Sequence, residues 1–279
     1  MIKKLSAIAL AVAAMSASAA HAGNVLVVLS DDATLDLKAG KTFQTGFYLN
    51  ELMQPVKMLL DAGHTVTFAT PNGKAPTLDK GSVNAMFFGG DQAALDAHHK
   101  LLEQLRLTDS ANSPVVSLAR VEQQGYGKYD AVYVPGGHAP MQDLLTSPAL
   151  GKVLAAFHQD GKPTALVCHG PIALLSAMPD AKGFTMKLAQ GATPAQPKWI
   201  YSGYKVTVFT NDEEEASKAQ LGGGEMKFYP QTALQKAGLQ FSKAANWQGN
   251  MVTDRELITG QNPASAPLVG KELLARLQK

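Results

Sequence analysis

The sequence predicts an α/β fold in which a mainly parallel sheet is covered by helices on both faces. Short apolar segments with the character of strands alternate with helical segments along most of the chain. The first of these strands is a continuous apolar run, which is typical of strands buried on both faces. Neither an internal repeat nor an inter-domain linker is evident, so residues 23–279 are expected to form a single domain.

Each expected element has its own signal. The strands are short apolar or β-branched runs, and the helices carry apolar residues at helical spacing, such as Leu52, Val56 and Leu59 in the first of them. In order, the strands are expected at residues 24–30, 65–70, 129–134, 162–167, 205–210, 239–242 and 257–259. The helices are expected at residues 51–62, 91–107, within 141–160, from Pro171 onward, 230–237 and 265–278. The less regular stretch from about residue 73 to residue 127 is expected to form a small inserted cap.

The first 22 residues have the features of a secretory signal peptide. Lys3 and Lys4 precede an apolar run at residues 7–14, and small residues end the segment at Ala22. The apolar run is too short to anchor the chain across a bilayer. The sequence therefore predicts cleavage after Ala22 and a periplasmic or secreted protein with no membrane partner.

Composition argues against some classes of partner. The formal charge of +2 comes from two lysines in the first 22 residues, which leaves 23 basic and 23 acidic residues in the remainder. A balanced charge favours neither nucleic acid nor an anionic membrane as a partner. Because Cys168 is the only cysteine, the chain forms no internal disulfide.

Cys168 lies where the strand at residues 162–167 ends and a helix is expected to open at Pro171. A side chain at such a turn is held above the carboxyl edge of the sheet, near amide donors and the positive end of the helix. We therefore expect the thiol to be acidified toward the thiolate. A small buried cysteine is the plain alternative, but the adjacent His169 and Gly170 favour a nucleophile with a base beside it.

No histidine follows His169, so the base for Cys168 is His169 or an earlier residue. His138 is an earlier candidate, because it follows a strand end and the glycines Gly136 and Gly137. Glycines there allow close backbone approach, and their amides can stabilise an oxyanion. Four other histidines are in turn or surface-helix contexts and are interpreted as solvated, with no metal site: His64, His98, His99 and His158.

Two acidic positions are candidates for partners of these groups. Glu51 falls in the first turn of a helix, where periodicity alone favours a solvated side chain. The run Asp212–Glu215 follows the strand expected at residues 205–210, and only one of its members can point at a histidine. Ligands bind beyond the carboxyl ends of the strands in open α/β sheets, so the loops after residues 30, 134, 167 and 210 are expected to converge.

Five segments along the chain carry recognisable motifs: residues 45–51 with Pro55, residues 135–138, residues 167–171, residues 209–211 with the acidic run, and residues 257–265. Together they resemble the ThiJ/PfpI superfamily, and more narrowly its glyoxalase III, protein deglycase and holding-chaperone branch. The resemblance implies a flavodoxin-like three-layer sandwich, often dimeric, with a nucleophile-elbow cysteine at Cys168.

The resemblance also implies roles for the other site residues. Glu51 would hydrogen-bond the cysteine and relay protons. His169 would pair with an acid after the strand that ends near Phe209, which spacing places at Glu214, with Glu213 as the alternative. The backbone amides of Gly137 and His169 would match the oxyanion site.

The implied activity is the conversion of a 2-oxoaldehyde such as methylglyoxal to lactate without metal, nucleotide or glutathione, or a related deglycase reaction. Cys168 would attack the aldehyde, and Glu51 or His169 would move a proton between adjacent carbons. The expected partners are a small aldehyde, glycated or unfolded proteins, and a second copy of the chain in a homodimer. Two other functions stay open: a holding chaperone, whose sign is an exposed apolar patch, and a cysteine peptidase or amidase that uses the same triad.

Overall fold

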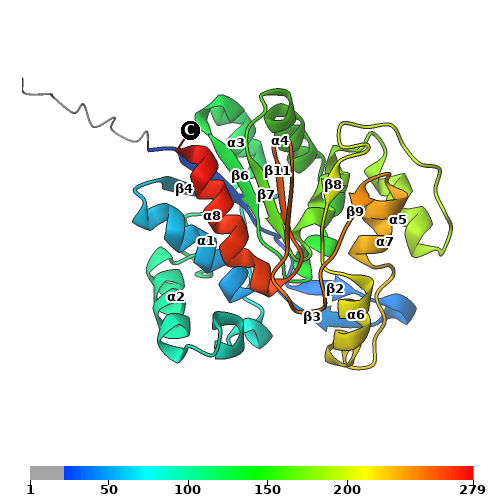
Figure 1. The fold of residues 1–279 in the computed structure, drawn as a ribbon, viewed down its shortest axis with the longest axis horizontal. Coiled ribbons are helices and arrows are strands. Elements are labelled where there is room, and N and C mark those ends of the chain that lie inside the picture. The colour runs from blue at the N-terminus through cyan, green and yellow to red at the C-terminus, as the bar shows by residue number, and fades with distance from the viewer. Residues whose placement is uncertain (1–21, 279) are drawn as a thin grey trace, which may run out of the picture.

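The computed structural model describes residues 22–278, so the predicted signal peptide up to residue 21 lies outside the described residues. Seven strands form the central sheet: β1 (Asn24–Val28), β4 (Thr65–Thr70), β5 (Val116–Ser117), β6 (Ala131–Val134), β7 (Thr164–Val167), β10 (Met251–Asp254) and β11 (Leu257–Gly260). Their order across the sheet is β10-β11-β7-β6-β1-β4-β5, and only the pair β10 and β11 is antiparallel. The mainly parallel, flavodoxin-like sheet predicted from the sequence is therefore confirmed (Figure 1).

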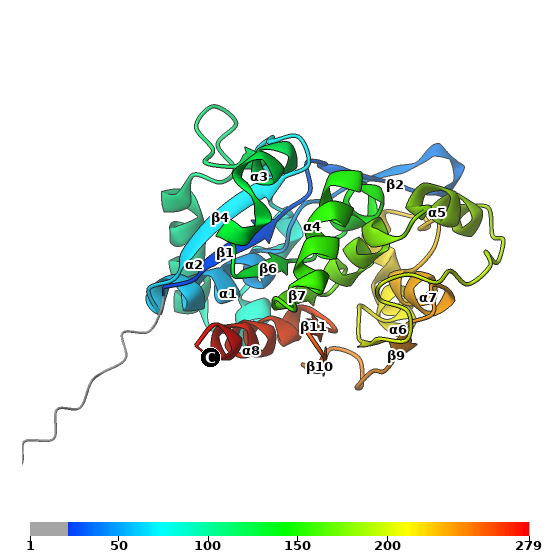
Figure 2. The same cartoon turned by 90° about the horizontal axis from the view of Figure 1, so that it is seen from above.

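Helices cover both faces of this sheet. One face carries α1 (Leu49–Asp61), α2 (Gln92–Leu105) and α8 (Ala266–Leu277), and the other carries α3 (Leu118–Gln124) and α4 (Pro148–Gln159), as Figure 2 shows from above. The side chains of β1 alternate between the two cores: Val25 and Val27 pack on the α1 side, and Leu26 and Val28 on the α4 side. This alternation explains the unbroken apolar run in the sequence, because neither face of the strand is exposed to water.

Smaller elements surround the carboxyl end of the sheet. They are the antiparallel pair β2 (Thr34–Asp36) and β3 (Thr42–Gln44), the helices α5 (Ala181–Ala189), α6 (Asn211–Ser217) and α7 (Pro230–Lys236), and the parallel pair β8 (Lys205–Val206) and β9 (Gln240–Phe241). The stretch expected to form a cap, residues 73–127, contributes β5, α2 and α3 as well as loop residues that cover the site. Within residues 22–278, no helix combines the length and the apolar character needed to cross a bilayer.

The strand expected at residues 205–210 is wrong beyond Val206. Both edges of β11 are already occupied, by β7 on one side and by β10 on the other. The segment after β8 is instead held by single bonds, from the Thr207 amide to Thr259 Oγ1 (3.0 Å) and from the Phe209 amide to the Cys168 carbonyl (2.9 Å). These bonds still bring the end of the segment to the carboxyl edge of the sheet.

Of the histidines interpreted as solvated, one is buried and another is partly buried. His64 is buried, and its Nδ1 accepts a hydrogen bond from the Gly23 amide (3.0 Å) where the chain enters β1. The Nδ1 atom of His158 lies 2.7 Å from the Glu256 carboxylate, beside the Tyr204 hydroxyl. Both histidines thus have structural partners, a pairing that the local sequence pattern does not reveal.

A tyrosine from the sheet compensates for a proline in α1. Pro55 lies inside this helix and has no N–H, so the carbonyl of Glu51, four residues earlier, loses its helical partner. The hydroxyl of Tyr133, on β6 and fully buried, donates a hydrogen bond to that carbonyl. Burial raises the pKa of Tyr133 well above its usual value, which keeps the hydroxyl as a donor. The contact ties the first turn of α1 to the strand beside it.

We predict that Tyr133→Phe lowers the free energy of unfolding by about 1–3 kcal/mol, because it leaves the buried Glu51 carbonyl without a donor. Urea unfolding monitored by circular dichroism measures this. Tyr129→Phe is the matched control, since within residues 22–278 the hydroxyl of that buried tyrosine bonds only the side chain of Gln124 (3.0 Å). Restoring an N–H with Pro55→Ala should make the Tyr133→Phe substitution less harmful, and equal losses in both backgrounds would contradict this account.

Candidate active site

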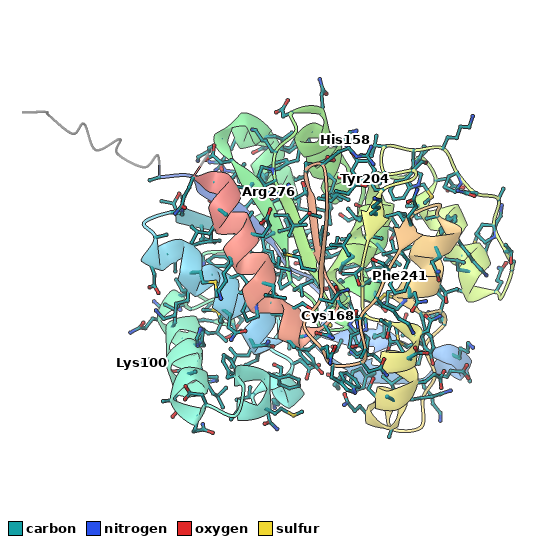
Figure 3. The ribbon with its side chains drawn as sticks, in the orientation of Figure 1. Lys100, His158, Cys168, Tyr204, Phe241 and Arg276 are labelled. Atoms are coloured by element: carbon teal, nitrogen blue, oxygen red, sulfur yellow. The ribbon has the colours of Figure 1, made fainter. Side chains whose placement is uncertain are left out.

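Cys168 occupies a strained turn at the carboxyl end of β7. Its φ is +59°, a left-handed conformation that is uncommon for a residue other than glycine. The turn is held from both sides, because the Cys168 amide donates to the Gly260 carbonyl (3.0 Å) and the Cys168 carbonyl accepts from the Phe209 amide (2.9 Å). The chain thus fixes the thiol at the edge of the sheet, at the lower end of the strands in Figure 3.

Two glycines allow the site to close around this thiol. A Cβ at Gly136 would lie 2.5 Å from Glu51 Oε2 and 2.7 Å from the Cβ of Cys168, so no side chain fits between the acid and the thiol. Gly137 has a φ of +80°, and a Cβ there would lie 2.0 Å from the Gly46 carbonyl oxygen. The sequence analysis expects these glycines to allow close approach of the backbone, and the distances support that expectation.

Glu51 is fully buried, not solvated as its helical periodicity suggests. The first half of α1 is buried on nearly all sides, which carries the side chain inward to the end of β7. Its Oε2 accepts a hydrogen bond from the Gly136 amide (2.9 Å), and its Oε1 has no hydrogen-bond partner within residues 22–278. Burial raises the pKa of Glu51 from 4.5 to about 8, so the carboxyl holds its proton at neutral pH.

The thiol and this carboxyl are close enough to perturb each other. Burial first, and then the charge of Glu51, raise the pKa of Cys168 well above its usual value, while the Gly137 amide lowers it in part. The expected acidification of the resting thiol is therefore not what the structure supports. The helix expected from Pro171 onward is present as the 3₁₀ helix Gly170–Ala177. The Cys168 and Glu51 pair thus retains its protons at neutral pH until a base or substrate removes one.

His169 lies between the thiol and a second acid. Its Nδ1 is 3.3 Å from Cys168 Sγ, and its Nε2 is 2.8 Å from Glu214 Oε1. Burial alone would raise the pKa of Glu214, but the charges and hydrogen bonds of His169 and His138 outweigh it and lower the pKa to about 2. Because the carboxylate can only accept, His169 Nε2 carries the hydrogen and Nδ1 presents a lone pair to the thiol. His169 is thus oriented as a base for Cys168.

The acid that pairs with His169 is Glu214, and Glu213 has a different role. Glu213 Oε2 accepts from the Thr210 amide (3.0 Å) in a capping box at the start of α6. Its Oε1 accepts from Asn262 Nδ2 (2.8 Å) and from the Trp247 amide (2.8 Å). Glu213 therefore holds loops in place around the site while its neighbour faces the histidine.

His138 completes a cluster with His169 and Glu214. The rings of His138 and His169 lie 4.2 Å apart, and His138 Nε2 is 3.8 Å from Glu214 Oε2. The three residues offer ligand atoms within 4.8 Å of one another, the one such metal-ligand group among residues 22–278. A metal ion there would take His169 Nε2 and the Glu214 oxygen away from their hydrogen bond. A bound metal would therefore compete with the hydrogen bonds that link Cys168, His169 and Glu214. The absence of a metal requirement stays a prediction.

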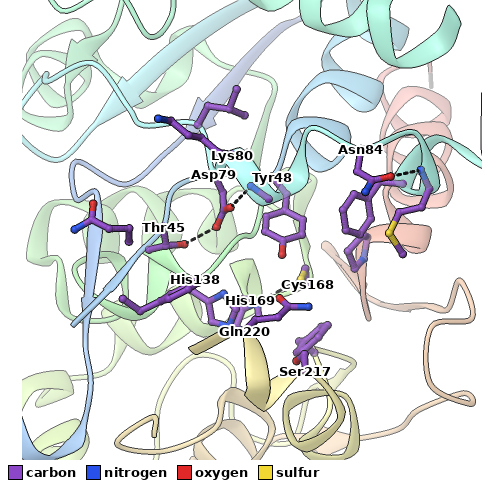
Figure 4. Close-up of a pocket in the computed structure, with 18 of the residues that line it drawn as sticks. Thr45, Tyr48, Asp79, Lys80, Asn84, His138, Cys168, His169, Ser217 and Gln220 are labelled. Atoms are coloured by element: carbon purple, nitrogen blue, oxygen red, sulfur yellow. Dashed lines mark hydrogen bonds between the residues drawn. The ribbon is translucent and has the colours of Figure 1, made fainter. Parts of the chain in front are cut away.

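A cavity of about 800 Å³ opens above these residues. Figure 4 shows Tyr48, Asp79, His138, Cys168, His169 and Ser217 around it. Its walls come from the end of β3, from residues 77–87 and from α6. His138 after β6, and Cys168 and His169 after β7, also line it, so the predicted convergence of loops holds for the ends of these two strands and for the segment after Thr210. Tyr48 is a lining residue that the sequence analysis missed, although it lies within the motif at residues 45–51. Burial raises the pKa of Tyr48, so its hydroxyl stays protonated beside Cys168.

We predict that Glu51→Gln changes the pH dependence of stability. Between pH 4.5 and about 8 the folded protein holds a Glu51 proton that the unfolded chain has released, so the free energy of unfolding of the native protein falls as pH rises through this range. The variant lacks this proton. The free energy of unfolding of the variant minus that of the native protein should therefore increase between pH 5 and 8, by up to about 1.4 kcal/mol per pH unit.

Denaturant titrations of both proteins at several pH values measure this difference. Glu51→Gln keeps the size of the side chain and an oxygen for the Gly136 amide, so packing changes little. A difference that stays constant across this pH range would show that Glu51 is already ionised in the folded protein.

Comparisons with known proteins show the family and the fold. The chain is 27% identical over 249 residues to the protein/nucleic acid deglycase HchA of Staphylococcus aureus (strain bovine RF122 / ET3-1), covering 88% of this chain and 77% of that protein. Its fold resembles that of the Rapid Encystment Protein 24 KDa of Francisella tularensis (TM-score 0.71, 23% identity, 91% of this chain and 99% of that chain). It also resembles the fold of glyoxalase III from Candida albicans (TM-score 0.67, 20% identity, 92% and 98%). Residues 43–218 match the family described as ThiJ/PfpI family-like, and the chain therefore belongs to the ThiJ/PfpI family.

Proposed function

We propose that the protein converts 2-oxoaldehydes to 2-hydroxy acids with Cys168 as the nucleophile and without a cofactor, as in the reaction of methylglyoxal to lactate. One observation carries the proposal: a buried carboxyl that keeps its proton at neutral pH lies beside a thiol whose other side faces a base. A hydrolase triad needs the thiol, the histidine and the anionic acid, but it has no use for a second, neutral acid. A reaction that moves protons between adjacent carbons does need one.

The steps balance with one water and no oxidant. The thiol of Cys168 adds to the aldehyde carbon; a C–S bond forms, His169 Nδ1 accepts the thiol proton, and Glu51 protonates the aldehyde oxygen to give a hemithioacetal. Glu51, now a carboxylate, removes the hydrogen on that carbon as a proton while the ketone oxygen takes the proton held by His169 Nδ1, which gives an enediol. Glu51 then returns its proton to the neighbouring carbon, and the oxygen on the sulfur-bearing carbon loses its proton to His169, which leaves a thioester. Water cleaves the C–S bond to release the hydroxy acid and the thiol.

Backbone amides and His138 have supporting roles in this scheme. The amide of Gly137 is directed at the thiol and at Glu51, where negative charge develops during the addition. His138 Nδ1 is buried without a hydrogen-bond partner among the described residues, and the residue lines the cavity. We assign this nitrogen to the substrate oxygen that Glu51 does not reach.

A deglycase reaction fits the same groups. The adduct of a 2-oxoaldehyde with an amine or guanidine also has a carbon that the thiol can attack, and the name of the relative HchA, a protein/nucleic acid deglycase, supports this extension. The expectation that this chain has no nucleic acid partner rests on its balanced charge and stays a prediction, as does the homodimer.

The holding-chaperone and peptidase alternatives have weaker support. The large apolar side chains exposed within residues 22–278 are few, and only two of them share a segment: Val83, Met86, Met186, Trp247 and Leu268. Two of them, Met86 and Trp247, line the cavity, so they belong to the site. A peptidase would leave the protonation of Glu51 without a role.

We also propose that the protein acts outside the cytoplasm after removal of residues 1–22. The two lysines, the short apolar run and the small residues before Gly23 support this. The position of β1 supports it as well, since the first strand begins at Asn24, two residues after the expected cleavage site.

We predict that the purified protein converts methylglyoxal to lactate without glutathione and in the presence of EDTA. Cys168→Ala should abolish turnover, and Glu51→Gln should lower kcat by about 100-fold or more, because a positioned acid and base is lost. Glu256→Gln, at a buried glutamate bonded to His158 at the opposite end of the strands (Figure 3), should keep turnover near that of the native protein.

Equal turnover by the native protein and Cys168→Ala would rule the proposal out. If Cys168→Ala fully suppresses aggregation of a denatured client while neither protein consumes an aldehyde or a glycated peptide, the chaperone alternative is correct. Cleavage of unmodified peptides by the native protein, without aldehyde turnover, would favour the peptidase.

For export, we predict that the protein recovered from the periplasm or medium of a Gram-negative host begins at Gly23, as read by N-terminal sequencing. Replacing Ala20 and Ala22 with bulky residues should block processing. A full-length chain confined to the cytoplasm would contradict the assignment.

A further inference from the structure

The cavity above Cys168 is much larger than a three-carbon aldehyde requires. Its volume is about 800 Å³, whereas sites for drug-sized ligands span roughly 300–1,000 Å³. Methylglyoxal, with five non-hydrogen atoms, would occupy only the floor formed by His138, Cys168 and His169. The side chains above that floor therefore determine what else the substrate carries.

One wall is a row of aromatic rings that starts at the base. Phe209 stacks on His169 with ring centres 4.7 Å apart and planes at 27°. Trp247 follows, 5.8 Å from Phe209, and is 51% exposed at the rim. A flat substituent on the reacting carbonyl can lie against this row while its carbonyl carbons stay at the thiol.

The backbone that carries the indole at the rim is held in place before any ligand arrives. Trp247 has a φ of +65°, and its amide donates to Glu213 Oε1 (2.8 Å). The same oxygen accepts from Asn262 Nδ2 and Gln261 Nε2, so Glu213 joins this loop to the helix that carries Glu214. An aromatic surface that is already ordered loses little entropy when it binds a ligand.

More apolar side chains line the cavity, beside uncharged polar ones such as Gln44, Asn84 and Gln220. Tyr48 and Phe87 pack edge to face with centres 5.3 Å apart, and Met86 lies beside them with 67% of its surface exposed. Lys80 and Asp79 are the charged side chains of the lining outside the catalytic cluster, and Asp79 already accepts hydrogen bonds from Thr45 Oγ1 (3.1 Å) and the Gly81 amide (2.9 Å). The walls thus favour an aromatic or bulky apolar group over a charged one.

We propose that the preferred substrates are 2-oxoaldehydes with an aromatic substituent on the ketone carbon, and that Trp247 determines this preference. The proposal rests on the proposed function, which supplies the reaction at the other end of the substrate. Beyond that function, it names the aromatic substituent that the cavity prefers and Trp247 as the residue responsible for the preference.

The test compares phenylglyoxal with methylglyoxal by initial rates. The native protein should favour phenylglyoxal by at least about tenfold in kcat/KM, since filling an apolar pocket by even one methylene is worth roughly that much. Trp247→Ala should lower the phenylglyoxal-to-methylglyoxal ratio of kcat/KM by about fivefold or more, and Met86→Ala should lower it less. Met186→Ala, which removes another exposed methionine, outside the cavity, should leave the ratio unchanged.

A binding arm separates this inference from the catalytic proposal. In the double variant Cys168→Ala, Trp199→Phe, Trp247 is the only tryptophan, and mandelate, the product of phenylglyoxal, should quench its fluorescence at lower concentration than lactate does. If neither aldehyde is consumed but mandelate binds at Trp247, the reaction fails while the aromatic selection stands.

Three outcomes overturn the inference: a ratio near one in the native protein, a ratio unaffected by Trp247→Ala, or equal quenching by lactate and mandelate. Turnover of methylglyoxal together with any of them leaves the proposed function intact. Turnover of a glycated peptide without a preference for phenylglyoxal would also overturn the inference, because it would show that the apolar walls bind a polypeptide.

Discussion

The site depends on the contact between a buried carboxyl and a buried thiol. Glu51 reaches Cys168 only because α1 enters the core with its first turn and because Gly136 has no side chain to separate the two groups. Tyr133 holds that first turn by its bond to the Glu51 carbonyl, which Pro55 leaves without a helical donor. The same residues that close the core on the α1 side of the sheet therefore set the distance between acid and nucleophile.

The two acids of the site differ because their surroundings differ. Glu51 faces the amides of Gly136 and Gly137 but, within residues 22–278, no cation, so burial dominates and its pKa rises to about 8. Glu214 is as deeply buried but faces two histidines, and its pKa falls to about 2. One carboxyl thus stays neutral and can donate a proton, and the other stays charged and orients His169. This difference separates the arrangement from a plain Cys–His–acid hydrolase.

Much of the fold could be predicted from the sequence, because buried parallel strands leave continuous apolar runs. The site elements at Gly136, Cys168 and His169 follow strand ends and could be placed for the same reason. The burial of Glu51 could not be read from periodicity, since a helix that points its first turn into the core looks like any amphipathic helix. The length of the strand that begins at Lys205 was overestimated. The free edge of β11 is occupied by β10, which lies about 50 residues later in the chain. Trp247 gave no signal, since a residue that lines a cavity needs no distinctive neighbours, and Tyr48 was not singled out within the motif at residues 45–51.

The central claim is that Glu51 is protonated beside Cys168 in the resting protein. Infrared difference spectroscopy of the native protein against Glu51→Gln tests it most directly, because a protonated carboxyl has a C=O stretching band that a carboxylate lacks. We expect this band at neutral pH and its loss as the pH rises past about 8. Absence of the band at neutral pH would show that Glu51 is ionised there and would contradict the account.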